Sequence, residues 1–309
     1  MNRVSSMLEA IGNTPLVQLR SVVPNEAADV YVKLEYFNPT GSYKDRMALS
    51  IVEEAEWRKD LVPGMTVVEC TGGSTGTSLA FVCTAKGYRS LVVSSDAFAR
   101  EKLKAIRMFG AELRLIQSEG GKITPDLIPR MMKAAEELSV KPGHYWTRQF
   151  TNEDALKGYG VMGTEIIEQL GRVPDVFVAA VGTAGMMGGV SRALRNQGSV
   201  RFIGLEPASA PLLSAGQKGS HRIEGIGVGI VPPLLSSESF DEIRTIDESE
   251  AREMARRLVR EEGILAGTSS GMNVAAAVAL AKELGPGKSV VTVACDSGYK
   301  YMAGDLFEV

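Results

Sequence analysis

Two segments of the chain are apolar at nearly every position rather than at every second position. They are Val176–Val181 and Val290–Ala294. A strand with one solvent-facing side alternates polar and apolar residues, whereas a parallel strand covered by helices on both faces is apolar throughout. Segments with helical spacing of apolar residues separate these and similar runs. We therefore predict an α/β fold with open, twisted, mostly parallel sheets and helices on both faces.

The coarse pattern alternates strands and helices, without internal repeats or low-complexity tracts. Strands are predicted at 29–35, 66–70, 90–95, 112–117, 175–181, 201–206 and 289–294. Helices are predicted at 42–58, 75–86, 98–108, 125–138, 153–170, 186–196, 248–262 and 270–284.

Lys44 is an unusual residue in this pattern, because it opens the predicted helix 42–58 on the face that should be buried. Apolar residues follow it at helical spacing, at Met47, Ala48, Ile51, Val52 and Ala55. A lysine in an apolar cleft at a helix N-terminus loses hydration and meets the positive end of the helix dipole. Both effects favour the neutral amine, which is the form that attacks carbonyl groups. The alternative is a lysine whose head group reaches solvent along its flexible stem.

Two glycine-rich loops each follow a predicted strand and open a helix. They are Thr71–Gly76 and Gly182–Gly189. Such a loop directs backbone N–H groups at whatever lies above it and can hold an anion, although glycines also serve simply as tight turns. Together with Lys44, the loops suggest a ligand with two anionic ends and a carbonyl between them. A phosphorylated aldehyde cofactor carrying an amino-acid carboxylate fits this description.

Several motifs, in order along nearly the whole chain, resemble those of the cysteine synthase family. These enzymes depend on pyridoxal 5'-phosphate (PLP) and have the fold type II architecture of the tryptophan synthase β subunit. The matching stretches are 11–16, 33–46, 71–76, 149–150, 182–186, 204–207, 225–232, 266–271 and 297–301. One such motif is weak evidence, but the ordered set is specific.

The resemblance implies a smaller domain at 40–150 and a larger PLP-binding domain formed by 151–309 together with 1–39, with the cofactor in the cleft between them. It implies PLP-dependent β-replacement on an O-activated serine through an aminoacrylate intermediate. The donor would be O-acetylserine or a related compound, and the acceptor sulfide or another nucleophile. It also implies a homodimer and a role in cysteine biosynthesis.

Residue roles follow from the same resemblance. Lys44 would form the internal aldimine and remove the α-proton of the substrate. The phosphate would bind to Gly182, Thr183, Ala184, Gly185 and Met186. The substrate carboxylate would bind to Thr71, Gly72, Gly73, Ser74 and Thr75, with help from Gln149. Ser74 would also contact the cofactor, and Ser269 would contact the pyridine nitrogen. Without the resemblance, Ser269 is more simply a helix cap.

Three positions depart from the family pattern. The family loop reads Thr-Ser-Gly-Asn-Thr-Gly, whereas this chain has Gly72 in place of the serine and Ser74 in place of the asparagine. Met186 stands where the phosphate loop usually has a threonine. We expect PLP binding to survive. We expect the shorter side chain of Ser74 and the extra glycine to enlarge and loosen the pocket, so that the donor or the nucleophile can differ from O-acetylserine and sulfide.

Composition excludes several other classes of protein. Lys and Arg number 34 against 37 Asp and Glu, without a basic stripe, so nucleic acid is not an expected partner. No hydrophobic signal stretch opens the sequence and no apolar run could span a bilayer, so we expect a cytoplasmic protein without membrane contact. The 3 cysteines and 2 histidines form no metal-like cluster, so no metal is expected.

Three alternatives remain open at this stage. A serine or threonine dehydratase shares the fold and cofactor but releases a keto acid and ammonia. A catalytically silent relative could act as a binding partner, although the intact Lys44 argues against it. A nucleotide-binding dehydrogenase is disfavoured, because the spacing of Gly182, Gly185 and Gly188 does not match the dinucleotide fingerprint.

Overall fold

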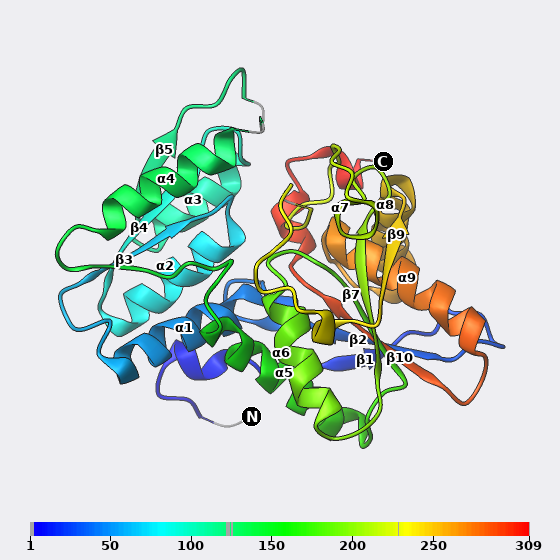
Figure 1. Ribbon diagram of the computed structural model, residues 1–309. Helices are drawn as coiled ribbons and strands as arrows, with labels where there is room; N and C mark the ends of the chain where they lie inside the picture. Colours follow the sequence, from blue (N-terminus) through cyan, green and yellow to red (C-terminus); the bar gives the residue numbers. More distant parts are fainter. Residues whose placement is uncertain (1–2, 122–123, 125, 228, 309) are drawn as a thin grey trace. The chain divides into compact units, whose positions relative to one another are not determined.

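The computed structural model describes residues 3–121, 124, 126–227 and 229–308. The chain divides into two compact units (Figure 1). Unit 1 consists of Met1–Ile11 and Lys44–Gly158, and unit 2 of Gly12–Tyr43 and Tyr159–Val309. These boundaries lie close to those predicted at 40 and 150, but the first residues fall in unit 1 rather than in the larger unit. Whether the units correspond to the predicted domains stays a prediction.

Unit 1 contains a four-stranded sheet in which every neighbouring pair is parallel, in the order β5-β4-β3-β6. Its strands are β3 (Thr66–Cys70), β4 (Arg89–Ser95), β5 (Glu112–Ile116) and β6 (His144–Trp146). Its helices are α1 (Lys44–Arg58), α2 (Ser74–Lys86), α3 (Arg100–Met108) and α4 (Leu127–Ser139). Apolar residues of α1 and α2 pack with Val67, and those of α4 pack with Val68. Because successive strand residues point to opposite faces, α1 and α2 cover one face of the sheet and α4 covers the other.

Unit 2 contains a six-stranded sheet in the order β1-β2-β10-β7-β8-β9. Its strands are β1 (Leu16–Gln18), β2 (Asp29–Leu34), β7 (Val176–Ala180), β8 (Arg201–Pro207), β9 (Glu242–Ile246) and β10 (Ser289–Ala294). Only the β1–β2 pair among these is antiparallel. The helices after the unit boundary are α6 (Gly185–Arg195), α7 (Leu212–Ala215), α8 (Glu248–Arg257) and α9 (Thr268–Leu284). The boundary itself falls within α5 (Asp154–Leu170).

The main core of unit 2 lies between its sheet and the helices α8 and α9. It joins apolar residues of α9, from Met272 to Ala281, to inward-facing residues of β2, β7, β8 and β10. On the other face, the Arg195 guanidinium of α6 lies 4.9 Å from the centre of the Phe202 ring. The sheet therefore has helices on both faces, which explains why its central strands are continuously apolar.

The α/β fold with two mostly parallel sheets is confirmed, and each predicted strand and helix is present with its ends shifted by a few residues. Three strands were not predicted: β1, β6 and β9. β1 and β6 have three residues each, and β9 alternates charged Glu242 and Arg244 with apolar residues. All three lie at sheet edges, where pairing with a neighbouring strand compensates for a weak apolar pattern. Pro125, in a predicted helix, and Val228, in the family-like stretch 225–232, lie outside the described residues.

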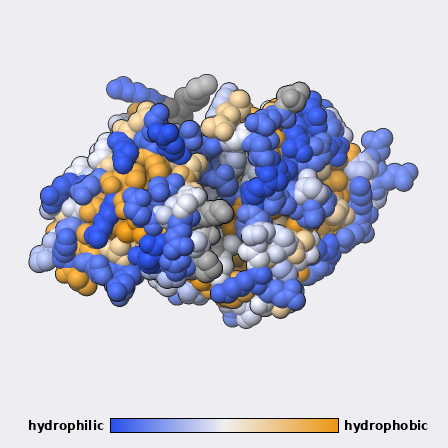
Figure 2. All heavy atoms as spheres, turned by 90° about the horizontal axis from the view of Figure 1, so that it is seen from above, coloured by the Kyte–Doolittle hydropathy of each residue, from blue (hydrophilic) through white to orange (hydrophobic). Residues whose placement is uncertain are grey.

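The surface is largely hydrophilic on the face shown in Figure 2, with hydrophobic residues among the polar ones. In the part of the chain that the structure describes, no helix is both long enough and apolar enough to cross a bilayer.

Candidate active site

Lys44 is the first residue of α1 and is buried, with 6% of its surface exposed. The apolar residues that follow it at helical spacing, Met47, Ala48, Ile51 and Val52, are fully buried. The predicted burial of this face is confirmed. α1 packs beside α2 through Ala48, Val52 and the apolar face of α2. The helix that carries the amine and the helix that follows the Thr71–Gly76 loop are therefore neighbours.

The loop at the start of α2 is tied directly to Gln149. Thr75 Oγ1 lies 2.7 Å from Gln149 Oε1, and Gln149 Nε2 donates to the carbonyl of Cys70 at 2.8 Å. Thr71 Oγ1 accepts the N–H of Gly73 at 3.1 Å. The two bonds of Gln149 bring together residues that are 74 and 79 positions apart in the sequence. Ser74, the first residue of α2, makes no side-chain hydrogen bond among the described residues.

Glu69 supports this arrangement and was missed by the sequence analysis. It is 2% exposed at the end of β3. Its Oε2 accepts from Thr147 Oγ1 at 2.6 Å and from the Gln149 N–H at 2.9 Å. Its Oε1 accepts the Cys70 N–H at 2.6 Å. Burial raises the pKa of Glu69, and these hydrogen bonds oppose that rise. The only sequence signal was a carboxylate inside an otherwise apolar strand.

On one side of the 71–76 loop, the packing does not agree with the expectation that Gly72 enlarges the pocket. A Cβ atom at position 72 would lie 2.7 Å from Cε1 of Phe98 and 2.9 Å from Cδ1. The aromatic ring therefore occupies the place that a side chain at this position would take. The glycine does not leave an empty volume on this side of the loop.

The Gly182–Met186 segment joins β7 to α6 in unit 2, and residues 181–190 are all buried. Ala184 adopts a left-handed conformation with φ 65°, which is uncommon for a residue with a side chain. The first N–H groups of a helix have no partner within the helix, and the Thr183 hydroxyl makes no hydrogen bond among the described residues. These groups form a set of donors suited to an anion. Met186 is buried and adds no hydroxyl.

Ser269 lies in the first turn of α9 and is 5% exposed. The helix is capped by Gly267, without a side-chain bond, so Ser269 is not the N-cap. Ser270, its neighbour, accepts the N–H of Cys295 at 3.0 Å. The Ser269 hydroxyl makes no hydrogen bond among the described residues, which leaves it available to a ligand.

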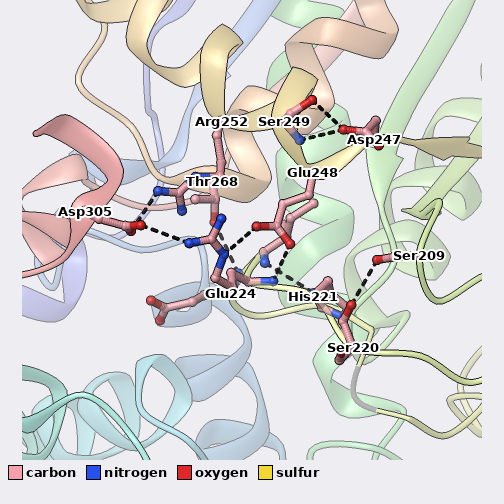
Figure 3. Close-up of polar contacts among 12 residues, drawn as sticks. Ser209, Ser220, His221, Glu224, Asp247, Glu248, Ser249, Arg252, Thr268 and Asp305 are labelled. Carbon is pink, nitrogen blue, oxygen red and sulfur yellow. Dashed lines mark hydrogen bonds and ion pairs between the residues drawn. The ribbon is translucent and has the colours of Figure 1, made fainter.

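The segment 221–227 packs against the 182–186 loop of the same unit. A Cβ at Gly182 would lie 2.6 Å from the carbonyl oxygen of Gly225, so only glycine fits there. Figure 3 shows the polar contacts that hold this segment. The Glu224 N–H donates to Thr268 Oγ1 at 3.2 Å, next to Ser269. Arg222 pairs with Glu248 at 2.7 Å and with Asp305 at 2.9 Å.

A shallow recess in unit 2 adjoins the 182–186 loop. Its lining includes Val181, Gly182, Leu213, Lys218 and Gly227. The structure thus places the predicted residues in two groups: Lys44, the 71–75 loop and Gln149 in unit 1, and the 182–186 loop and Ser269 in unit 2.

Comparison with known proteins gives a consistent result. Residues 7–296 match the family model described as pyridoxal-phosphate dependent enzyme. A cysteine synthase from Staphylococcus aureus is 41% identical over 307 residues, which cover 98% of this chain and 97% of that protein. An O-ureido-L-serine synthase from Streptomyces lavendulae is 40% identical over 308 residues, which cover 98% and 93%.

The fold comparison agrees with the sequence comparison. The crystal structure of a cysteine synthase from Entamoeba histolytica superposes with a TM-score of 0.92 at 34% identity, covering 100% of this chain and 92% of that one. Matches of this extent cover both glycine loops and Lys44. The chain therefore belongs to the family of pyridoxal-phosphate dependent enzymes and is a cysteine synthase-like member of it.

Proposed function

We propose that the protein catalyses β-replacement on an O-activated L-serine, with sulfide or another nucleophile as the acceptor. The observation that carries this proposal is the burial of Lys44 at the start of α1, in a chain that matches the PLP-dependent family from residue 7 to residue 296. Burial disfavours the charged form of an amine, and the neutral form is the one that attacks an aldehyde such as that of PLP.

The residues of unit 2 fit the phosphate of PLP. The 182–186 loop offers backbone N–H groups and the Thr183 hydroxyl, and the close approach of Gly225 to Gly182 excludes a side chain that would fill the cradle. The Ser269 hydroxyl would bind the pyridine nitrogen. A neutral hydroxyl there leaves the ring nitrogen largely unprotonated. When bound, PLP supplies an electron sink for the α-carbon of the amino acid, and this neutral partner favours β-elimination chemistry over transamination.

The residues of unit 1 would hold and deprotonate the donor. Its carboxylate would bind to the N–H groups at the start of α2, including that of Thr75, and to the hydroxyl of Thr71. The Thr75 hydroxyl donates to Gln149 Oε1, so Gln149 holds this turn in place. Lys44 Nζ would bear the cofactor between turnovers and would take the proton from the donor α-carbon. Departure of the O-substituent then opens the β-carbon to the incoming nucleophile.

Product analysis tests this proposal. Purified holoenzyme is incubated with O-acetyl-L-serine, O-phospho-L-serine or L-serine, each with and without sulfide. β-Replacement predicts L-cysteine that depends on sulfide and on an activated donor. Pyruvate and ammonia formed at the same rate with or without sulfide would indicate a dehydratase, and the absence of any product would indicate a silent relative.

We further propose a homodimer in the cytoplasm. The dimer rests on family resemblance, and sedimentation analysis of the purified protein tests it. The location is supported by Cys70, Cys83 and Cys295, which are buried and free. Free thiols are typical of reducing compartments. Fractionation of the source cells tests the location.

A further inference from the structure

The segment that directly follows β10 in unit 2 is hydrogen-bonded to the loop before α1. The N–H of Tyr43 donates to the carbonyl of Cys295 at 3.0 Å. The N–H of Ser297 donates to the carbonyl of Gly41, also at 3.0 Å. Tyr43 is covalently bonded to Lys44, the first residue of α1. The backbone of the lysine therefore starts from a point that unit 2 holds by two hydrogen bonds.

The same segment, residues 295–298, also pairs with the start of α9. The N–H of Gly267 donates to the carbonyl of Asp296 at 3.2 Å. Gly267 is the N-cap of α9, and Ser269 lies in the first turn that follows it. One short segment is therefore bonded both to the residue before Lys44 and to the helix end that carries Ser269.

Two buried side chains, Asp296 and Tyr301, hold the segment against Gly267. The Tyr301 hydroxyl donates to Asp296 Oδ2 at 3.0 Å, and each residue is 6% exposed. A Cβ atom at Gly267 would meet Cε2 of Tyr301 and would lie 2.5 Å from Asp296 Oδ1, so the pair packs directly on the backbone of the N-cap. Burial, and next the negative charge of Asp296, raises the pKa of Tyr301 well above its ordinary value, so this phenol remains a donor near neutral pH.

The two groups that this segment joins would hold opposite ends of one ring. In PLP the carbon that bears the aldehyde lies para to the ring nitrogen. Lys44 would bind the aldehyde carbon and Ser269 would meet the nitrogen, so the ring fits only when the distance between the two residues matches its length. Reacting groups must be held close to their productive geometry, which requires support from residues behind them. The 295–298 segment is in the right place to give that support.

We propose that Asp296 and Tyr301 are positioning residues for the cofactor ring, which hold the start of α9 at a fixed distance from the residue before Lys44. Both act through Ser269 and Lys44 and are assigned no contact with the reacting atoms. This inference rests on the proposed function, in which Lys44 and Ser269 bind PLP. Without the pair, the cofactor should still bind, but its ring should be held less firmly.

A double-mutant cycle in the holoenzyme tests the pair. The variants are Tyr301→Phe, Asp296→Ala and the two combined, with Thr292→Val as control. The control also removes one buried hydrogen bond, from the Thr292 hydroxyl to the carbonyl of Val178 at 2.6 Å, and it lies on β10 itself.

Each protein is measured for Tm, for the visible circular dichroism of the bound cofactor, and for kcat and donor KM with the donor that the wild type prefers. Free PLP is achiral, so its visible circular dichroism reports how the protein orients the ring. This signal does not depend on turnover.

Tyr301→Phe should change the circular dichroism and lower kcat by about tenfold or more, because a misplacement of about 1 Å can cost about 10²-fold. Donor KM should change less, because the donor carboxylate would bind to the 71–75 loop. The combined variant should lose no more kcat than the worse single variant, because both single changes break the same hydrogen bond. Thr292→Val should lower Tm to a similar extent and leave the circular dichroism and kcat unchanged.

Three results would overturn the inference: wild-type circular dichroism and kcat in Tyr301→Phe, equal losses in Thr292→Val, or additive losses in the combined variant. If Asp296→Ala does not fold, the comparison of Tyr301→Phe with Thr292→Val decides the question alone. A wild-type holoenzyme whose cofactor is bound to a lysine other than Lys44, or responds to no serine derivative, would instead refute the proposed function, and this inference with it.

Discussion

Glu69 Oε2 accepts the backbone N–H of Gln149 at 2.9 Å, and this bond joins the end of β3 to the residue that orients Thr75. Both oxygens of the carboxylate accept, from Cys70 and Trp146 on one side and from Thr147 and Gln149 on the other. The groups of Cys70, Trp146 and Gln149 are N–H groups, which cannot accept a hydrogen bond. The Thr147 hydroxyl donates to the carboxylate as well. The site is therefore built for a carboxylate rather than for its amide isostere.

Glu69→Gln should destabilise unit 1 and weaken donor binding. The amide NH₂ group would face donors on whichever side it occupies, and unsatisfied buried groups cost about 1–3 kcal/mol. We expect a lower Tm and a rise in donor KM that exceeds the fall in kcat, because Gln149 loses its anchor. Glu136→Gln on the surface of α4 is the control. A wild-type Tm and KM in Glu69→Gln would show that the carboxylate does not position Gln149.

Ser74→Asn should shift donor preference toward that of ordinary cysteine synthases. Asparagine is the family residue at this position, and its longer side chain can reach a ligand directly where serine needs a water. The measurement is the ratio of kcat/KM for O-acetyl-L-serine and O-phospho-L-serine. The control is Ser199→Asn, at an exposed position between α6 and β8. An unchanged ratio would remove Ser74 from the donor site.

Ala184→Gly should raise the Tm of the apoprotein while weakening PLP binding. The left-handed conformation of Ala184 costs about 1 kcal/mol more than it does for glycine, and the variant relieves that strain. The freed loop then loses more conformational entropy when a phosphate binds. Apoprotein melting and fluorescence titration with PLP measure the two effects.

The control is Ala193→Gly, in the body of α6. Glycine within a helix lowers the free energy of unfolding by about 1 kcal/mol relative to alanine, so this variant should have a lower Tm. If Ala184→Gly lowered Tm to the same extent as the control, position 184 would not be strained.

Asp305→Asn should lose less of its free energy of unfolding than the wild type when the pH is lowered. The hydrogen bond from Arg252, with the charges of Arg252 and Arg222, lowers the pKa of Asp305 below its usual value, against a smaller opposing effect of burial. A depressed folded-state pKa gives stability that is complete above the unfolded pKa of about 3.9 and is lost as pH falls through the folded value. The effect should be small, because Asp305 is exposed at the surface.

Melting curves between about pH 3 and pH 7 compare the wild type, Asp305→Asn and the exposed control Glu238→Gln. The wild type and Glu238→Gln should lose stability in parallel, and Asp305→Asn should show a shallower decline. Identical slopes in all three proteins would mean that the contacts of Asp305 with Arg222 and Arg252 do not contribute to folding. The contact with Arg252 is drawn in Figure 3.

The sequence predicted those parts of the molecule that depend on local pattern. Continuous apolar runs marked β7 and β10, and the spacing after Lys44 marked the buried face of α1, because both patterns follow from backbone periodicity. The edge strands were missed because their stability comes from pairing, which the pattern of three to five residues does not record. The role of Glu69 was missed for a related reason: its partners Thr147 and Gln149 are nearly 80 positions away.

Gly72 shows that the sequence can also suggest more freedom than the structure allows. A glycine in a loop suggests freedom when only neighbouring residues are considered. The residue that removes this freedom, Phe98, comes from the turn after the next strand, and its ring reaches back to the loop only because β3 and β4 are adjacent and parallel. The effect of a substitution in such a loop on pocket size can therefore be inferred only when the residues that contact the loop in the folded structure are known.

The most direct measurement is the location of the bound cofactor. Protein purified with saturating PLP is reduced with borohydride, digested and mapped by mass spectrometry. The account predicts one pyridoxyl group per chain, on the peptide that contains Lys44, and its loss in Lys44→Ala. A pyridoxyl group on another lysine, or none on a protein saturated with the coenzyme, would contradict it.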